Sequence, residues 1–163
     1  FRYGVQVVMP KSFDRVVYYG RGPVENYSDR KTSAFIGKYS QSVDEQFYPY
    51  IRPQENGTKS DLRWWMLVDD AGDGLRFTSS EAFSASALHY TVESLDEGLV
   101  KANGHSQEVP EAELTNVLVD KSQMGLGCIT SWGALPLEEY MLPFGDYEFV
   151  FKMTPVLNHI DRD

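Results

Sequence analysis

The chain has 163 residues, 42% of them hydrophobic and 13% aromatic, which fits one globular domain or part of one and argues against disorder. Its formal net charge of −9 argues against partners that present phosphate backbones, such as nucleic acid, and against anionic membranes. The single cysteine, Cys128, excludes an internal disulfide, and no apolar run is long enough to span a membrane.

Hydrophobic residues recur with a period of two through most of the chain, which is the pattern of β-strands. In chain order we expect strands at 5–9, 15–19, 62–68, 75–79, 87–92, 114–119 and 147–153. The turn-forming residues 69–74 predict a hairpin between the third and fourth of these strands. Helical signals are confined to 42–47, where Ser42 and Glu45 match a capping box, and to 94–99. The pattern predicts an all-β sandwich.

The chain shows no internal repeat and no linker, so we expect one β-domain over residues 1–156, followed by a polar tail over 157–163. Residues 101–113 are the most polar and are predicted to form a loop. The sequence opens at Phe1 without an initiator methionine, which predicts a fragment of a longer protein. No signal peptide is found in it. The compartment, cytoplasm or periplasm, stays open.

Trp132 is the candidate functional residue with the most distinctive setting, the stretch 124–140 between two strand-like runs. Tryptophan is usually largely buried, which favours a place in the core. The flanking Ser131 and Gly133 favour a permissive loop that presents the ring to a sugar. The residues alone leave both interpretations open.

Trp64 and Trp65 are adjacent within a predicted strand, so their side chains should point to opposite faces of the sheet. We expect one of them in the core. The other is predicted at a domain or subunit interface, where aromatic residues are enriched.

Two motifs together resemble a known family: GRGPVENYSDR at 20–30 and MGLGCITSWGALPLEEY at 124–140. Their residues and their order resemble the C-terminal end of the large β-galactosidases of glycoside hydrolase family 2, over about 20–156 of this chain. The resemblance implies a galactose-mutarotase-like β-supersandwich, of which this chain is the C-terminal portion.

The resemblance also implies a role for Trp132. In the family, the tryptophan of the GxGxxxSW pattern reaches into the active site of the catalytic barrel and stacks against the substrate. Trp132 is therefore the predicted substrate-binding residue. Residues 128–130 (CIT) depart from the Gly-Asp-Asn-like stretch of many members, so no polar contact is carried over to them.

The parent enzyme that the resemblance implies hydrolyses terminal β-D-galactosides by a retaining, two-carboxylate mechanism. In the family both catalytic glutamates lie in a separate (β/α)₈ barrel, so this chain is predicted to supply no catalytic residue and to be inactive alone. The Mg and Na ions that the family often uses belong to that barrel, so no cofactor is predicted here. The implied partners are the β-galactoside and the barrel of the same polypeptide, and large relatives assemble, which leaves a homo-oligomer open.

The remaining polar motifs are interpreted as structural. Glu25 and Asp29 could be paired glycosidase carboxylates, but the barrel of the family already holds that pair, so the motif 20–30 is predicted to be a structural loop with Asp29 and Arg30 as neighbours. The same holds for RPQENG at 52–57, and a substrate-lining role for either loop is the minority interpretation.

Metal and nucleotide sites are not predicted. The three histidines, His89, His105 and His159, lack the converging spacing of a metal site. The two Gly-x-Gly stretches lack the third glycine and the helix of a nucleotide loop.

Two alternatives to an enzyme domain stay open. The first is a stand-alone carbohydrate-binding module with Trp132 and Trp65 on its surface. The second is an interaction domain in which Trp132 is buried.

Overall fold

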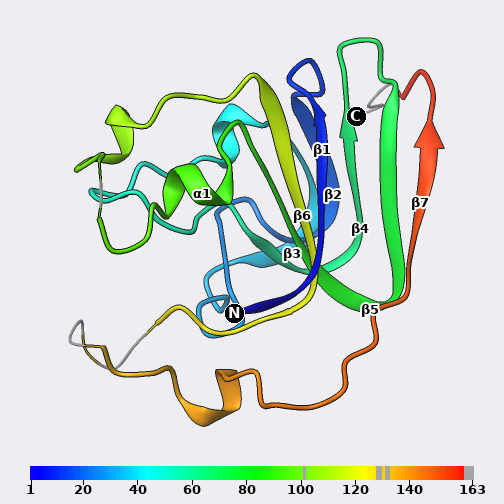
Figure 1. Ribbon diagram of the computed structural model, residues 1–163. Helices are drawn as coiled ribbons and strands as arrows, with labels where there is room; N and C mark the ends of the chain where they lie inside the picture. Colours follow the sequence, from blue (N-terminus) through cyan, green and yellow to red (C-terminus); the bar gives the residue numbers. More distant parts are fainter. Residues whose placement is uncertain (101, 128–129, 131–132, 160–163) are drawn as a thin grey trace.

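Seven strands form one antiparallel sheet in the computed structural model, which describes residues 1–100, 102–127, 130 and 133–159 (Figure 1). The strands are β1 Arg2–Pro10, β2 Arg15–Gly22, β3 Phe35–Ser42, β4 Lys59–Val68, β5 Gly74–Leu88, β6 Leu114–Gln123 and β7 Phe151–Val156. The helical elements are η1 Asp44–Gln46, α1 Val92–Leu95, η2 Ser106–Glu108 and η3 Glu138–Tyr140. The chain is all-β, which confirms the predicted fold class. Within the described residues, no helix has the length and apolar content needed to cross a membrane.

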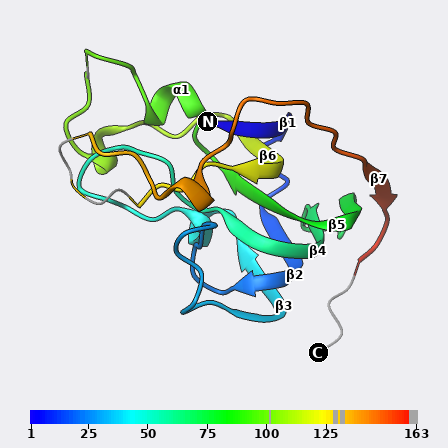
Figure 2. The same cartoon turned by 90° about the horizontal axis from the view of Figure 1, so that it is seen from below.

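The sheet runs in the order β1-β6-β5-β4-β2-β3, and β7 pairs with β5. The long strand β5 is the axis of this arrangement, because β7 pairs with its first half and β6 with its second half. The segment between η3 and β7 passes beside β1 in Figure 2, where the Tyr3 hydroxyl donates to the carbonyl of Tyr147 at 2.7 Å. This segment leads the chain to β7, which pairs with the first half of β5.

The main core lies on one face of the sheet and is built from alternating strand residues. Trp65 and Tyr18 are 0% exposed, and Phe77 packs edge-on against Trp65 with ring centroids 5.7 Å apart. A smaller cluster on other positions of the same strands includes Met66, against which the half-buried Trp64 packs. The period of two therefore accounts for both clusters, since neighbouring residues of a strand face opposite sides.

The two adjacent tryptophans take different environments, as predicted. Trp65 is the core residue, which overturns the surface position that the binding-module alternative gave it. Trp64 lies under the guanidinium of Arg76, 4.8 Å from the ring centroid. Its predicted place at an interface stays a prediction.

Most of the predicted strands are confirmed, and so is the hairpin at 69–74. Asp69 closes that turn, because its carboxylate accepts hydrogen bonds from the backbone N–H of Ala71 and of Asp73, both at 2.9 Å. The helical turn after β3 is also confirmed. Ser42 and Glu45 bond reciprocally there, the Ser42 N–H donating to the carboxylate at 2.7 Å.

Four features were predicted wrongly or missed. β3 was missed, because its sequence FIGKYSQS carries polar residues on an edge strand. β5 is one continuous strand, whereas the sequence predicted two. The prediction failed because the exposed polar residues 80–81 interrupt the hydrophobic alternation. Residues 89–92 are not a strand; Thr91 instead caps α1, which begins before the predicted turn at 94–99. β7 begins at 151, not 147.

Three stretches gather at one end of the sheet, which we call the loop end: 23–34 after β2, 50–58 before β4, and 124–127 after β6 (Figure 2). At the opposite end, the start of the predicted polar tail is tied to the β4–β5 hairpin. There the His159 N–H donates to the carbonyl of Gly72 at 2.9 Å. The loop end collects the polar motifs of the sequence and is the candidate site.

Candidate functional site

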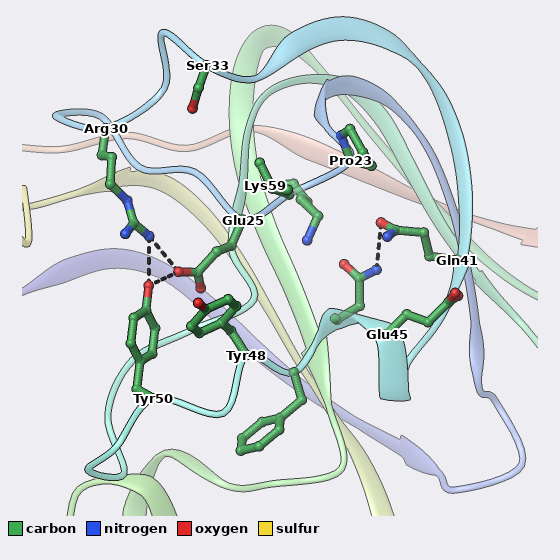
Figure 3. A pocket seen from close by; sticks show the side chains of 12 residues that line it. Pro23, Glu25, Arg30, Ser33, Gln41, Glu45, Tyr48, Tyr50 and Lys59 are labelled. Atoms are coloured by element: carbon green, nitrogen blue, oxygen red, sulfur yellow. Dashed lines mark hydrogen bonds and ion pairs between the residues drawn. The ribbon is translucent and has the colours of Figure 1, made fainter.

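Glu25 is the centre of a buried hydrogen-bond cluster at the loop end (Figure 3). Its side chain is only 7% exposed. The carboxylate accepts four hydrogen bonds: from the Gly57 N–H at 2.8 Å, the Tyr27 hydroxyl at 3.1 Å, Arg30 Nη2 at 2.5 Å and the Tyr50 hydroxyl. Because two of these donors precede β3 in the sequence and two follow it, one carboxylate holds two separate loops together.

Burial and the charge of Glu25 keep the two tyrosine hydroxyls of this cluster protonated. Burial raises the pKa of the Tyr27 hydroxyl far above its usual value, and the charge of Glu25 adds to the effect. Burial and the hydrogen bond to Glu25 also raise the pKa of Tyr50. Both hydroxyls therefore stay protonated and act as donors. A carboxylate offers about four lone-pair sites. Each of these sites on Glu25 accepts a hydrogen bond from the protein, so the role of Glu25 is structural.

Asn26 fixes the same loop from the other side. Its side chain is buried, and its carbonyl oxygen accepts from the N–H and the hydroxyl of Ser60 at 3.0 and 2.5 Å. Its amide group donates to the carbonyls of Arg21 and Val24 at 3.1 and 3.0 Å. These contacts fit the structural role predicted for the motif at 20–30.

Asp29 connects this motif to the segment that precedes Trp132. Its Oδ2 accepts a hydrogen bond from the Gly127 N–H at 2.6 Å, and the Gly125 N–H donates to the carbonyl of Tyr140 at 2.8 Å. A Cβ atom on Gly125 would lie 2.6 Å from Asp29 Oδ2 and 2.9 Å from the Cβ of Tyr140. Glycine at 125 therefore permits an approach that any side chain would block.

The pairing of Asp29 and Arg30 differs from the simple expectation that the two neighbours serve each other. Arg30 turns to Glu25, whereas Asp29 turns to the backbone of Gly127. A cavity of about 170 Å³ lies where these loops meet, and Leu126 is part of its wall. The motif at 20–30 is thus a brace for the segment 124–127, a contact that spans almost one hundred residues of sequence.

Trp132, the predicted substrate-binding residue, lies outside the described residues, as does Cys128. The role of Trp132 stays a prediction. The described residues nearest to it in the sequence on the N-terminal side are Thr130 and the braced Gly127.

A larger cavity of about 390 Å³ lies on the other side of Glu25, in front of Lys59. Lys59 is 1% exposed, and burial lowers the pKa of its ammonium group to about 8, although the nearby charge of Glu25 opposes the shift. The sequence analysis missed this residue, because the strand that it predicted begins at Leu62. The register of β4 against β5 is irregular between Lys59 and Leu62.

His89 takes a structural position. His89 is buried, with Nδ1 3.1 Å from the carbonyl of Leu114 and 3.3 Å from the Thr115 hydroxyl. Across the described part of the chain, no group of three or more His, Cys, Asp or Glu side chains could hold a metal ion.

Comparison with known proteins identifies the family to which this chain belongs. The family model described as "Beta galactosidase small chain" matches residues 1–153. The chain belongs to the β-galactosidase small chain family. This finding confirms the resemblance that the two sequence motifs carried.

Individual relatives agree with the family match. The chain is 38% identical over 154 residues to a β-galactosidase of Priestia megaterium, a match that covers 94% of this chain and 14% of the relative. It is 33% identical over 156 residues to a β-galactosidase of Streptococcus thermophilus, covering 94% of this chain and 15% of the relative. A β-galactosidase of Lactobacillus delbrueckii subsp. bulgaricus is 37% identical over 141 residues, covering 86% and 13%. The small-chain domain thus corresponds to about one seventh of these relatives.

Proposed function

We propose that this chain is the C-terminal domain of a retaining β-galactosidase of glycoside hydrolase family 2, which hydrolyses terminal β-D-galactosides. The observation that carries the proposal is the family match over residues 1–153, together with relatives named β-galactosidase that align with 94% of the chain. Within that enzyme the domain contributes a substrate platform and packing around the active site, and the catalytic carboxylates lie elsewhere in the polypeptide.

The chemistry of the described carboxylates supports a non-catalytic role. A retaining glycosidase needs two carboxyl groups about 5 Å apart that are free to reach the glycosidic bond. Glu25 is filled by four donors, and Asp29 is committed through Oδ2 to the backbone of Gly127. Neither can act as the nucleophile or the acid without dismantling the loop end.

The brace from Asp29 to Gly127 supports Trp132 as the platform. A stacking ring assists catalysis only if it is held in place, because positioning errors of about 1 Å can cost about two orders of magnitude in rate. The segment that leads to Trp132 is held by two backbone hydrogen bonds and by glycine at 125, which admits the Asp29 carboxylate. Asp29 is thus a positioning residue for this platform.

The proposed partners follow from the same placement. They are the β-galactoside, the catalytic barrel of the same polypeptide with its Mg and Na ions, and further copies of the enzyme in a homo-oligomer. The large apolar side chains exposed beyond β6 fit a surface that packs on another domain. They include Leu135 at 63%, Phe144 at 107% and Val150 at 67% exposure.

Kinetics of the parent enzyme test the proposal. On a panel of nitrophenyl glycosides we expect a preference for the β-galactoside, and Trp132→Ala should lower kcat/KM by about 1–3 kcal/mol of transition-state stabilisation. Trp132→Phe, which keeps an aromatic face, should lose less. Unchanged kinetics in Trp132→Ala would remove the platform and keep the family, whereas absent galactoside turnover would withdraw the substrate.

The chain alone should have no glycosidase activity. Turnover of a nitrophenyl galactoside by the purified chain, surviving in Glu25→Gln, would contradict the assignment of catalysis to other parts of the polypeptide. The alternative of a stand-alone binding module makes a different forecast, because the chain would then bind free galactose through Trp132 and lose this binding in Trp132→Ala.

A further inference from the structure

The cavity in front of Lys59 has the features of a ligand site that the proposed function leaves unused. It lies between the β2–β3 connection and the stretch from η1 to Tyr50, and its volume of about 390 Å³ falls within the roughly 300–1,000 Å³ of small-molecule pockets. It shares the Arg30–Tyr50 pair as a wall with the smaller cavity beside Gly127. The segment that leads to Trp132 therefore adjoins the other cavity, not this one.

The floor of this cavity is a buried cation with hydrogen-bonding capacity to spare. Lys59 is 1% exposed, and among the described residues its Nζ donates one hydrogen bond, to the carbonyl of Gly57 at 3.3 Å. A lysine ammonium group carries three N–H donors. Figure 3 shows this side chain pointing into the cavity. An oxygen-rich ligand would satisfy donors that are costly to leave unpaired in a buried site.

The wall opposite supplies amide groups that both donate and accept. Gln46 is 3% exposed, and its Nε2 donates to Oε1 of Gln41 at 2.9 Å (Figure 3). Amide side chains are suited to hydroxyl groups, since each amide has two N–H donors and one carbonyl oxygen. The pair is fixed, so a ligand meets preset directions for its hydrogen bonds.

The charges around the cavity select against ions. Two carboxylates, Glu25 and Glu45, face two cations, Arg30 and Lys59. An anion would meet the carboxylates and a cation would meet Lys59, so neither gains a uniform field. A neutral molecule that offers both hydroxyl donors and oxygen acceptors avoids both conflicts.

The rim adds an exposed aromatic face. Tyr48 is 54% exposed, and its ring lies tilted against Tyr50 with centroids 4.5 Å apart. Exposed rings of this kind pack against the C–H faces of sugars through their apolar surface. We propose that the cavity bounded by Lys59, Gln41, Gln46 and Tyr48 is a binding site for one uncharged monosaccharide unit, separate from the segment of Trp132 and independent of its role.

Binding measurements on the purified protein test this site. Methyl β-D-galactoside and methyl β-D-glucoside are titrated by NMR, with sodium acetate and sodium phosphate as anionic probes. We expect saturable binding of at least one glycoside and none of the anions. Tyr48→Ala should weaken the affinity about fivefold. Lys59→Met should weaken it about tenfold, which corresponds to about 1.4 kcal/mol.

Controls separate this site from the other one and from misfolding. Tyr19→Ala removes a tyrosine that is 40% exposed on β2 and should bind the glycoside like the unaltered protein. If Lys59→Met does not fold, Tyr48→Ala, an exposed substitution, decides the question. The site is refuted by a folded protein that binds no glycoside, by anions that bind instead, or by binding that Trp132→Ala abolishes and Tyr48→Ala leaves intact.

Discussion

Replacing Glu25 by glutamine tests whether one carboxylate holds the loop end together. Each carboxylate oxygen serves two donors: Oε1 accepts from Arg30 and Tyr50, and Oε2 accepts from Tyr27 and Gly57. Glutamine keeps one acceptor oxygen. We expect it to face Gly57, because a backbone N–H cannot turn away, which places the amide nitrogen against the other two donors.

The magnitude follows from which partners can adapt. The Tyr50 hydroxyl can rotate and accept from the new amide. Arg30 is 55% exposed and can turn to water, so its lost ion pair is discounted to about 0–1 kcal/mol. With a charged hydrogen bond worth about 1.5–3 kcal/mol, Glu25→Gln should lower the free energy of unfolding by about 2 kcal/mol. Glu25→Ala also strands Gly57 and Tyr27 and should cost about 3–5 kcal/mol.

Urea unfolding followed by tryptophan fluorescence measures both changes. Glu148→Gln is the matched control, because Glu148 is exposed and the same substitution there should stay within about 0.5 kcal/mol of the unaltered protein. The reasoning is refuted if Glu25→Gln behaves like this control, or if Glu25→Ala costs no more than Glu25→Gln.

Three further predictions concern buried charges and glycine. Burial raises the pKa of Asp120 to about 6, a shift that the nearby Arg2 opposes. Because the folded state binds the proton more tightly than the unfolded state, the free energy of unfolding should fall by up to about 3 kcal/mol as pH rises from about 4 to 6. Asp120→Asn should abolish this fall, as measured by urea unfolding. Burial lowers the pKa of Lys59 to about 8, so the charged form destabilises the fold below that pH. Lys59→Met should therefore raise the free energy of unfolding at pH 7 by about 1–3 kcal/mol, with a smaller gain at pH 10. Gly125→Ala puts a Cβ atom 2.6 Å from Asp29 Oδ2 and should cost about 1–3 kcal/mol of stability by overpacking.

Each of these has an outcome that contradicts it. A pH profile of Asp120→Asn parallel to that of the unaltered protein would mean that Asp120 does not titrate in this window. Destabilisation by Lys59→Met at pH 7 would mean that the attraction to Glu25 outweighs desolvation. For the glycine, Gly145→Ala is the control, since no atom lies within 4 Å of a Cβ there, and equal stability of the two variants would deny the close approach of Asp29.

The strands that could be predicted are those rich in hydrophobic residues. β1, β2, β4 and β6 are of this kind, and the last three contain runs of buried residues. β3 and the middle of β5 are not, because their side chains meet solvent and hydrogen bonds to neighbouring strands hold them in the sheet. Local pattern cannot show such strands, since their partners lie far away in the sequence.

The site divides in the same way. The resemblance of the motifs at 20–30 and 124–140 predicted the family, which the family match confirms, whereas the role of Trp132 stays a prediction. That Asp29 braces Gly127 was not predictable, because this contact joins segments that only the sheet brings together. The burial of Lys59 beside a cavity was likewise not predictable, because the cavity is formed by segments that are separate in the sequence.

The sequence by itself determined the all-β class, the hairpin at 69–74, the opposite environments of Trp64 and Trp65, and the family. All of these rest on residues close together in the chain or on short sequence motifs. Only the tertiary structure decided that Glu25 is filled by four donors and that Lys59 faces a cavity. Those properties depend on which distant groups surround a charge, and burial by distant groups leaves no local pattern in the sequence.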